Sequence, residues 1–311
     1  MPMGAKDHSV LGKRLLKQPF PDVLTLVGRE LAQAVLVAAP SAQAGSDEGI
    51  HVQRVAVRRL RSLIRCCAPV LRSSDIDEFA EDLSWLGSAL GARRDVDVLE
   101  NHLRSAINAL TPDDRSESAA RVDEYVLKLY SAADVRLGEV FTSERYANLG
   151  EQLVALELGA FVRADAPTSV ETVVGELIHG SWRRLAKSVD QIHSESDIAE
   201  WHRVRTRGKK LRYVMEVFAP IFGKDYERLG RRLAAVTDEL GEQRDAYACA
   251  LALRDIADAV DPHVAFELGK VAAAQDARVV MAIEDFPGLW RRVRRCCVWP
   301  RTRRTPSLSA L

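Results

Sequence analysis

The pattern of apolar and polar residues along the chain is that of α-helices. Apolar residues recur three and four positions apart in almost every segment, and the chain is rich in Ala, Leu, Arg and Glu, which favour helices. Alternating, strand-like patterns are scarce. Turn-forming residues interrupt the helical pattern at residues 19–21, 39–48, 111–114, 163–169, 193–197 and 261–262. We therefore predict an all-α protein whose long antiparallel helices pack into bundles.

An internal repeat appears when His51 is aligned with His202. At this shift of 151 residues the matching pairs are Arg54 with Arg205, Arg58 with Lys209, Arg59 with Lys210, Leu60 with Leu211, Arg61 with Arg212, Ala68 with Ala219 and Pro69 with Pro220. A shift of 150 residues aligns a second block, which pairs Leu90, Gly91, Arg94 and Asp95 with Leu240, Gly241, Arg244 and Asp245. Ser46 and Asp197, each five positions before its histidine, are predicted helix N-caps. These matches predict two pseudo-symmetric antiparallel helical bundles that arose by internal duplication.

The repeat also predicts how the chain is divided. Repeat one covers about residues 21–160 and repeat two about residues 161–290. Residues 1–20 form a basic N-terminal segment that we expect to be flexible. Residues 291–311 form an Arg-rich C-terminal tail, which either aids solubility or adds an accessory arm for anions.

Composition says little about the ligand but indicates the cellular compartment of the protein. The 311 residues include 44 basic and 44 acidic side chains, so the net charge points to no anionic partner, and only the placement of the charges is informative. The five cysteines show no CxxC spacing, which favours a reducing cytosol. No stretch of about 18 uninterrupted apolar residues occurs, and the N-terminal region lacks the apolar run of a signal peptide. We expect a cytoplasmic protein without a membrane partner.

Each repeat carries a stripe of cations along one helix face. On a helical wheel the first stripe occupies an arc of roughly 80° and consists of His51, Arg54, Arg58, Arg61 and Arg65. The second stripe consists of His202, Arg205, Lys209 and Arg212, with Glu216 at the position of Arg65. Residues 51–72 contain six arginines and residues 201–212 contain six Lys or Arg, and neither segment contains an acid. The second stripe is therefore one charge shorter than the first.

Two interpretations of the stripes are open. Many charge runs are only solvated helix faces, but such faces mix both signs, because like charges stacked four residues apart repel. Two copies of the same unfavourable stripe indicate an anion that neutralises it. Arginine favours phosphate in particular, because the planar guanidinium donates to two oxygens at once.

The histidines and the second repeated block have alternative roles. His51 and His202 either cap and pack the helix starts or donate hydrogen bonds to the anion. In the second case we expect their pKa to be lowered until the anion binds. Neither histidine has the His, Cys, Asp or Glu neighbours that a metal site needs. Asp95 and Asp245 are either catalytic carboxylates or, as we favour, ion-pair partners that orient stripe arginines. Gly91 and Gly241 would allow close helix packing or a kink. Arg93, Arg94 and Arg244 are candidate auxiliary anion contacts.

The repeated motif His-x-x-Arg-x-x-x-[Arg/Lys]-[Arg/Lys]-Leu-Arg, followed by Leu-Gly-x-x-Arg-Asp, resembles the CHAD family, named for its conserved histidine α-helical domain. The resemblance covers about residues 21–290. It implies two helical bundles around a basic channel, binding of inorganic polyphosphate, and association with polyphosphate granules. The family's basic positions fall on His51, Arg54, Arg58, Arg59 and Arg61, and on His202, Arg205, Lys209, Lys210 and Arg212. Gly208 and Glu216 depart from a continuous basic helix, and the Glu-x-Glu-x-Lys motif of the triphosphate tunnel domain found in some relatives is missing.

Together these observations predict a non-enzymatic polyphosphate-binding protein with no cofactor, no metal and no catalytic residues. A phosphate-processing enzyme is one alternative, and it would need carboxylates that hold Mg²⁺ beside the stripes. A nucleic-acid binder is another, but the stripes carry no interleaved aromatic residues for base stacking.

Overall fold

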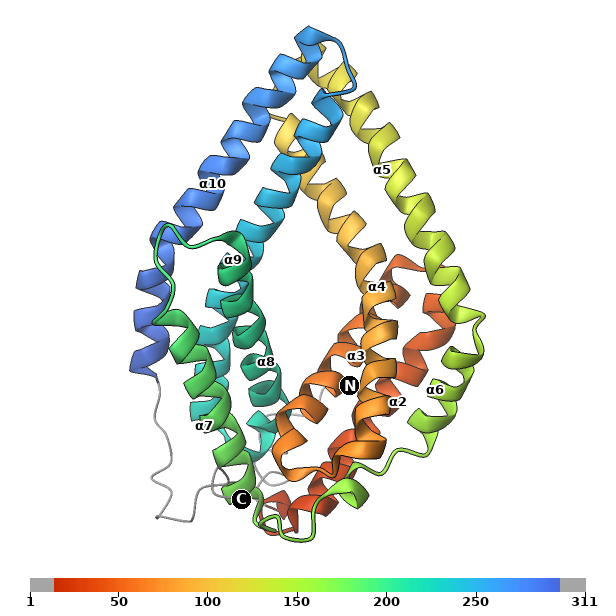
Figure 1. Cartoon of the computed structure of the whole chain (residues 1–311), viewed down its shortest axis with the longest axis vertical. Helices are drawn as coiled ribbons and strands as arrows, with labels where there is room; N and C mark the ends of the chain where they lie inside the picture. Colours follow the sequence, from red (N-terminus) through yellow and green to blue (C-terminus); the bar gives the residue numbers. More distant parts are fainter. Residues whose placement is uncertain (1–13, 297–311) are drawn as a thin grey trace.

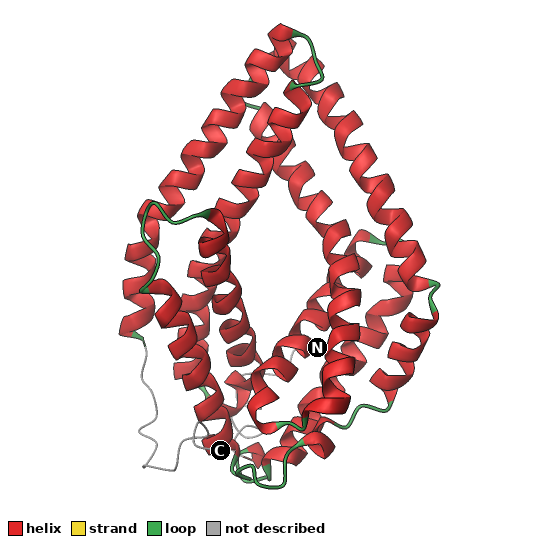
Figure 2. Cartoon of the chain, in the orientation of Figure 1, coloured by secondary structure: helices red, strands yellow, loops and turns green. Residues whose placement is uncertain are grey.

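The protein is all-α, as the sequence predicts. A computed structural model describes residues 14–296, apart from the side chains of residues 73–75 and 220–221. Within these residues the helices are α2 (Phe20–Gln43), α3 (Asp47–Cys67), α4 (Ser73–Ile107), α5 (Pro112–Phe141), α6 (Glu144–Val154), α7 (Val170–Val189), α8 (Ile198–Phe222), α9 (Lys224–Ala257) and α10 (Pro262–Arg295), with 3-10 turns at Ala68–Val70 and Leu158–Phe161. The described part of the chain contains no β-strand, only two isolated bridges (Figure 2).

Local chemistry sets where the two motif helices begin. The Ser46 side chain accepts a hydrogen bond from the Gly49 amide at 3.2 Å, at the start of α3. The Asp197 carboxylate accepts one from the Glu200 amide at 2.7 Å, at the start of α8. Each side chain satisfies an amide that has no partner inside the helix. Both predicted N-caps are confirmed.

The helices form two sides that meet at both ends. Figure 1 shows α4 and α5 on one side, α9 and α10 on the other, and the two pairs converging at one tip. A hydrophobic cluster joins the sides at that tip, where Leu103 of α4 and Val122 of α5 pack with Leu253 of α9 and Leu268 of α10. At the opposite end α3 and α8 pack against each other within the main core. The motif helices, α3 on one side and α8 on the other, are thus held against each other.

The order of the helices agrees with the predicted repeat. Helices α3, α4 and α5 have 21, 35 and 30 residues, and they are followed in the same order by α8, α9 and α10 with 25, 34 and 34 residues. The internal duplication itself stays a sequence prediction, as does the division into repeats at about residue 160.

The two end segments are described only in part. Residues 1–13 of the predicted flexible N-terminal segment lie outside the described residues, but Leu15 and Phe20 are buried in the core. Apolar side chains at the end of this segment thus contribute to the core, and the flexibility of the segment stays a prediction. Residues 291–295 of the predicted tail belong to α10, and residues 297–311 lie outside the described residues.

One described helix, α2, is long and apolar enough to cross a membrane by length and composition. In this fold its apolar side enters the core, where Phe20, Val23 and Leu24 are fully buried. Buried core helices pass the same length and composition test. The absence of a membrane partner therefore stays a prediction.

Candidate functional site

The two motif helices present their apolar sides to the core and their cations away from it. Leu60 of α3 and Leu211 of α8 are fully buried at equivalent repeat positions. The Tyr213 ring on α8 contacts cations of both helices, with the Arg58 guanidinium 4.6 Å and the Arg212 guanidinium 5.0 Å from its centroid. Because a tyrosine face attracts cations, this ring holds an arginine of each stripe in place. The two stripes therefore meet.

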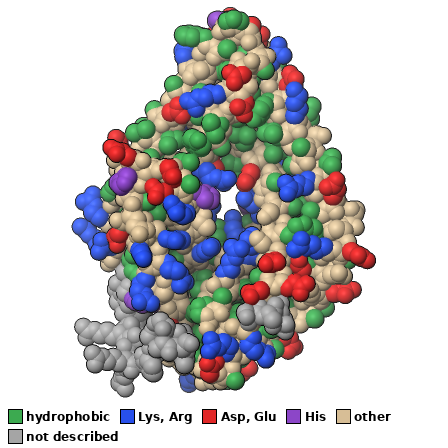
Figure 3. Space-filling view, in the orientation of Figure 1, with side chains coloured by type: hydrophobic (Ala, Val, Ile, Leu, Met, Phe, Trp, Pro, Cys, Tyr) green, Lys and Arg blue, Asp and Glu red, His purple; other side chains and the backbone are tan. Residues whose placement is uncertain are grey.

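Five cations from both helices make up what we call the central cation cluster. Its members are Arg54 and Arg58 of α3, and Arg205, Lys209 and Arg212 of α8. Burial, followed by the four arginines, lowers the pKa of Lys209 to about 7. Burial also lowers the pKa of Arg58 and of Arg205. Figure 3 shows Lys and Arg side chains gathered around an opening between the α3–α4 side and the α8–α9 side of the molecule.

The members of the cluster differ in how they are neutralised. Arg54 forms an ion pair with Asp95, with 3.0 Å between the guanidinium nitrogen and the carboxylate oxygen. Arg212 pairs with Asp238 at 3.0 Å and with Glu216 at 3.4 Å, so two acids compensate the charge of this second-stripe arginine.

In contrast, Arg58, Arg205 and Lys209 form no hydrogen bond or ion pair with any residue in the described part of the chain. The Nε atoms of Arg58 and Arg205 are buried without a partner. Burying a charge is costly unless a counter-charge or hydrogen bond compensates for it. These three charges therefore lack a hydrogen-bonded or ion-paired counter-charge among the described residues.

The second repeated motif, Leu-Gly-x-x-Arg-Asp, lies on α4 and α9 and adjoins stripe arginines of α3 and α8. A β-carbon added at Gly91 would lie 3.7 Å from the Arg54 Nε, and one added at Gly241 would lie 3.2 Å from an Arg205 guanidinium nitrogen. A side chain at Gly241 would therefore press on Arg205, whereas one at Gly91 would be in ordinary van der Waals contact with Arg54. Asp95 forms an ion pair with Arg54, which confirms the predicted pair. Burial lowers the pKa of Arg205, and the nearby Asp245 offsets part of this lowering.

The two histidines lie at the start of the stripes. The His51 Nδ1 atom is buried with no hydrogen-bond partner in the described part of the chain. The His202 Nε2 atom lies 3.3 Å from the Thr206 hydroxyl. Burial, followed by Arg244, Arg205 and Lys209, lowers the pKa of His202, in the predicted direction. Among residues 14–296 no group of three or more His, Cys, Asp or Glu side chains is arranged to hold a metal ion.

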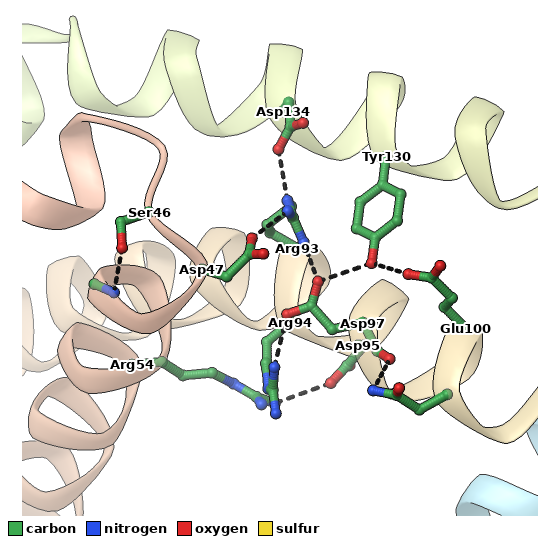
Figure 4. Close-up of polar contacts among 12 residues, drawn as sticks. Ser46, Asp47, Arg54, Arg93, Arg94, Asp95, Asp97, Glu100, Tyr130 and Asp134 are labelled. Carbon is green, nitrogen blue, oxygen red and sulfur yellow. Dashed lines mark hydrogen bonds and ion pairs between the residues drawn. The ribbon is translucent and has the colours of Figure 1, made fainter.

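The structure gives Arg93 a different role from the expected auxiliary anion contact. Arg93 is 8% exposed and donates to the carboxylates of Asp47, Asp97 and Asp134 (Figure 4). Its guanidinium also lies over the Tyr130 ring, 4.3 Å from the centroid. A cation already surrounded by acids from α3, α4 and α5 joins these helices and is not available to a ligand.

Arg94 lies beside this network and donates to the second Asp97 oxygen at 2.9 Å, with a side chain that is 30% exposed. Arg244 lies on α9 near His202 and Arg205, and its charge lowers the pKa of both. Contact of Arg94 and Arg244 with an anion stays a prediction.

The remaining cations gather in a second group, which we call the outer cation cluster. Its members are Arg61 and Arg65 of α3, Arg184 of α7, and Arg207 and Lys210 of α8. Sequence reasoning missed Arg184 and Arg207. Arg207 lies within the basic segment 201–212 but off the predicted stripe, and Arg184 stands outside both motifs, so no sequence pattern marked it. Arg59 is exposed on α3.

Comparison with known proteins assigns the family. The family model of the CHAD domain matches residues 27–254. The chain belongs to the CHAD domain family. Two uncharacterized proteins of Mycobacterium tuberculosis, MT2285 of strain CDC 1551 and Rv2226 of strain H37Rv, are each 25% identical to it over 237 residues. The match covers 74% of this chain and 44% of each relative, so this CHAD protein spans less than half the length of these relatives.

Solved structures share the fold. PptA from Streptomyces chartreusis superimposes with a TM-score of 0.73 and 21% identity, over 88% of this chain and 99% of that one. The CHAD domain from the plant Ricinus communis superimposes with a TM-score of 0.72 and 23% identity, over 90% and 93% of the two chains. At these identities the likeness concerns the CHAD fold alone.

Proposed function

We propose that this CHAD protein binds inorganic polyphosphate without transforming it, through a basic channel that the central cation cluster lines. The observation that carries the proposal is the meeting of Arg58, Arg205 and Lys209 from both motif helices, with no carboxylate partner in the described chain. An extended polyanion neutralises such a cluster at several points at once. Membership of the CHAD family agrees with this ligand. We further propose that the protein is cytoplasmic and associates with polyphosphate granules.

Two features favour polyphosphate over nucleic acid. The aromatic side chain in contact with the cluster, Tyr213, is only 3% exposed and is covered by Arg58 and Arg212. It therefore offers no face on which a base could stack, and stacking is a main contribution to binding of single strands. In addition, polyphosphate has no sugars between its phosphates, so it presents more negative charge to the cluster over the same length of chain.

The same arrangement favours binding over catalysis. Phosphoryl transfer depends on divalent metal ions that bridge the phosphate oxygens, and carboxylates hold these ions. In the central cation cluster the nearby carboxylates Asp95, Asp238 and Glu216 are engaged with arginines. Asp245 lies near Arg205, but it belongs to no group of three or more possible metal ligands within residues 14–296. Fixed Arg and Lys side chains are expected to meet the ligand charge directly.

We expect purified protein to bind long-chain polyphosphate in EDTA as tightly as in Mg²⁺, and to release no phosphate. A binding titration at several salt concentrations, with a parallel phosphate-release assay, measures both. The slope of log affinity against log salt should be steep, because each neutralised phosphate releases counterions. Single-stranded RNA of equal charge should compete poorly. A Mg²⁺ requirement together with phosphate release would establish the enzyme instead, and equal competition by RNA would favour the nucleic-acid binder.

Polyphosphate affinity should fall as the pH rises above 7, because of Lys209. In the free protein its pKa is lowered to about 7, so below that pH the ammonium is already present. A bound polyanion raises this pKa, so above pH 7 binding must take up a proton and becomes weaker. We expect a loss of roughly tenfold or more between pH 7 and 8.5, since one pKa unit corresponds to about tenfold. His202, whose pKa is lowered, titrates below this window.

The matched variant for this measurement is Lys209→Arg. It keeps the positive charge throughout the window, because a guanidinium is always protonated there. The variant should bind with an affinity that changes little between pH 7 and 8.5. The same steep decrease in the variant and the wild type would show that another group is responsible.

A further inference from the structure

Two adjacent lysines of α8 belong to different groups of cations. Lys209 is surrounded by Arg54, Arg58, Arg205 and Arg212, the other members of the central cation cluster. Lys210 has Arg65 and Arg61 of α3, Arg207 of its own helix and Arg184 of α7 as its charged neighbours. Burial and these four arginines lower its pKa. The outer cation cluster is therefore a second concentration of positive charge, built from three helices.

The outer cluster is also without acidic partners. Arg61 donates to the Ser84 hydroxyl at 2.8 Å, and its Nε atom is buried without a partner. Arg207 donates to the main-chain oxygen of Arg184 at 3.3 Å, and Arg184 donates to the Ser181 hydroxyl at 3.1 Å. None of the five cations forms an ion pair with a carboxylate of the described residues. Neutral oxygens hold the arginines in position and leave their charge uncompensated.

The cluster is not a consequence of the repeated motif alone. At the shift of 151 residues, Arg207 corresponds to Ala56, which is buried on α3. Arg184 comes from α7, which packs on α8 and carries neither repeated block. Two of the five cations are thus particular to the second half of the protein. They add charge beside Lys210, away from the second stripe.

The two clusters adjoin along one helix face. Arg58 of the central cluster and Arg61 of the outer cluster are three residues apart on α3, so their side chains are neighbours on its surface. From Arg54 to Arg65 the helix rises by roughly 16 Å, at 1.5 Å per residue. A single extended polyanion that leaves the central cluster along α3 therefore reaches the outer cluster, whereas a short oligophosphate covers only part of this length.

We infer that the outer cation cluster of Arg61, Arg65, Arg184, Arg207 and Lys210 is a second phosphate subsite, which takes the continuation of a polyphosphate chain held at the central cluster. The inference rests on the proposed function and adds to it a residue set and a length requirement. Binding of one chain at both clusters raises the effective concentration of phosphate at the second one, so affinity increases once the chain spans both. Arg184 and Arg207 determine this preference for long chains.

The test is Arg184→Ala combined with Arg207→Ala, titrated with long-chain polyphosphate and with tripolyphosphate. We expect the double variant to lose roughly tenfold in long-chain affinity, less than a partly buried pair would lose because both arginines are exposed and solvent screens their contacts, and less than about twofold in tripolyphosphate affinity. The double lysine variant of the same positions should keep most of the long-chain advantage. Arg183→Ala with Arg203→Ala is the matched control, because it removes two exposed cations from the same two helices, of which Arg203 pairs with Glu200. The control should change neither affinity by more than about twofold.

The outcomes separate this inference from the proposed function. If the wild type binds long chains and the double variant binds them equally well, the second subsite is wrong and the proposed function stands. Equal losses with both ligands, or an equal long-chain loss in the control, would mean that only general charge attraction was removed, which also overturns the subsite. If the wild type binds no polyphosphate, the proposed function fails and the subsite fails with it. Unchanged helical content by circular dichroism confirms that the variant is folded.

Discussion

Replacing Arg58 and Lys209 together by alanine should lower the affinity for long-chain polyphosphate by roughly 100-fold or more. The two side chains come from different motif helices, are partly buried, and lack carboxylate partners within residues 14–296. A hydrogen bond to a charged group contributes about 1.5–3 kcal/mol, so the loss of two contacts amounts to about 3 kcal/mol or more. That free energy corresponds to roughly 100-fold in the dissociation constant. Titration at fixed salt and pH measures it.

The control for this prediction removes the same charge elsewhere. Arg121 and Lys128 are exposed on α5, and both pair with Glu124. Their double alanine variant should bind polyphosphate within about threefold of the wild type. The Arg58 and Lys209 variant should remain folded, with no decrease in melting temperature, because it relieves repulsion between buried cations. Equal losses of affinity in the two double variants would show that a diffuse field, and not a site, attracts the ligand.

Arg93→Ala should destabilise the protein by about 3 kcal/mol, since the removal of one partner from a buried ion pair leaves the other charge uncompensated. The variant leaves Asp97, whose side chain is 9% exposed, with Arg94 as its remaining ion-pair partner. It also removes the ion pairs that join Asp47 of α3 and Asp134 of α5 to α4. For a chain of this size we expect the melting temperature to fall by roughly 5–10 °C. Thermal unfolding followed by circular dichroism measures the change.

Arg104→Ala is the matched comparison on the same helix. Arg104 pairs with Glu100 and Asp123, but its side chain is 50% exposed. Exposed ion pairs contribute less than about 1 kcal/mol, so this variant should melt within a few degrees of the wild type. Below its transition the Arg93 variant should still bind polyphosphate within about threefold. A large loss of affinity with unchanged stability would instead show that Arg93 is part of the binding site.

Local chemistry explains which features the sequence predicts. Helix starts depend on a side chain and an amide three positions away, so Ser46 and Asp197 are recognisable as N-caps without any structure. Helix faces depend on a fixed rotation per residue, so Arg54 and Arg58 are predicted to share a face. The motif Leu-Gly-x-x-Arg-Asp predicts an ion pair of Asp95 with the stripe because its charge is opposite, and the structure confirms the partner as Arg54.

Long-range contacts decide which cations remain available. Arg93 and Arg94 are adjacent in the sequence and equally basic, yet Arg93 is buried among Asp47, Asp97 and Asp134. Two of these acids lie about 40 residues or more away along the chain, on other helices. The sequence indicates that an arginine is present at each position. It does not indicate which arginine a distant acid will neutralise.

By itself the sequence determined the helical class, the helix starts, and a cationic stripe on each motif helix, because spacing within one helix governs all three. Only the tertiary structure decided that Lys209 meets Arg58 of the other half, and that Arg184 of α7 joins Arg61 and Lys210. Arg58 and Lys209 are 151 positions apart, and no rule of helical spacing relates them. Packing of α3 against α8 and of α7 against α8 brings these cations together, and Coulomb interactions depend on distance in space, not along the chain.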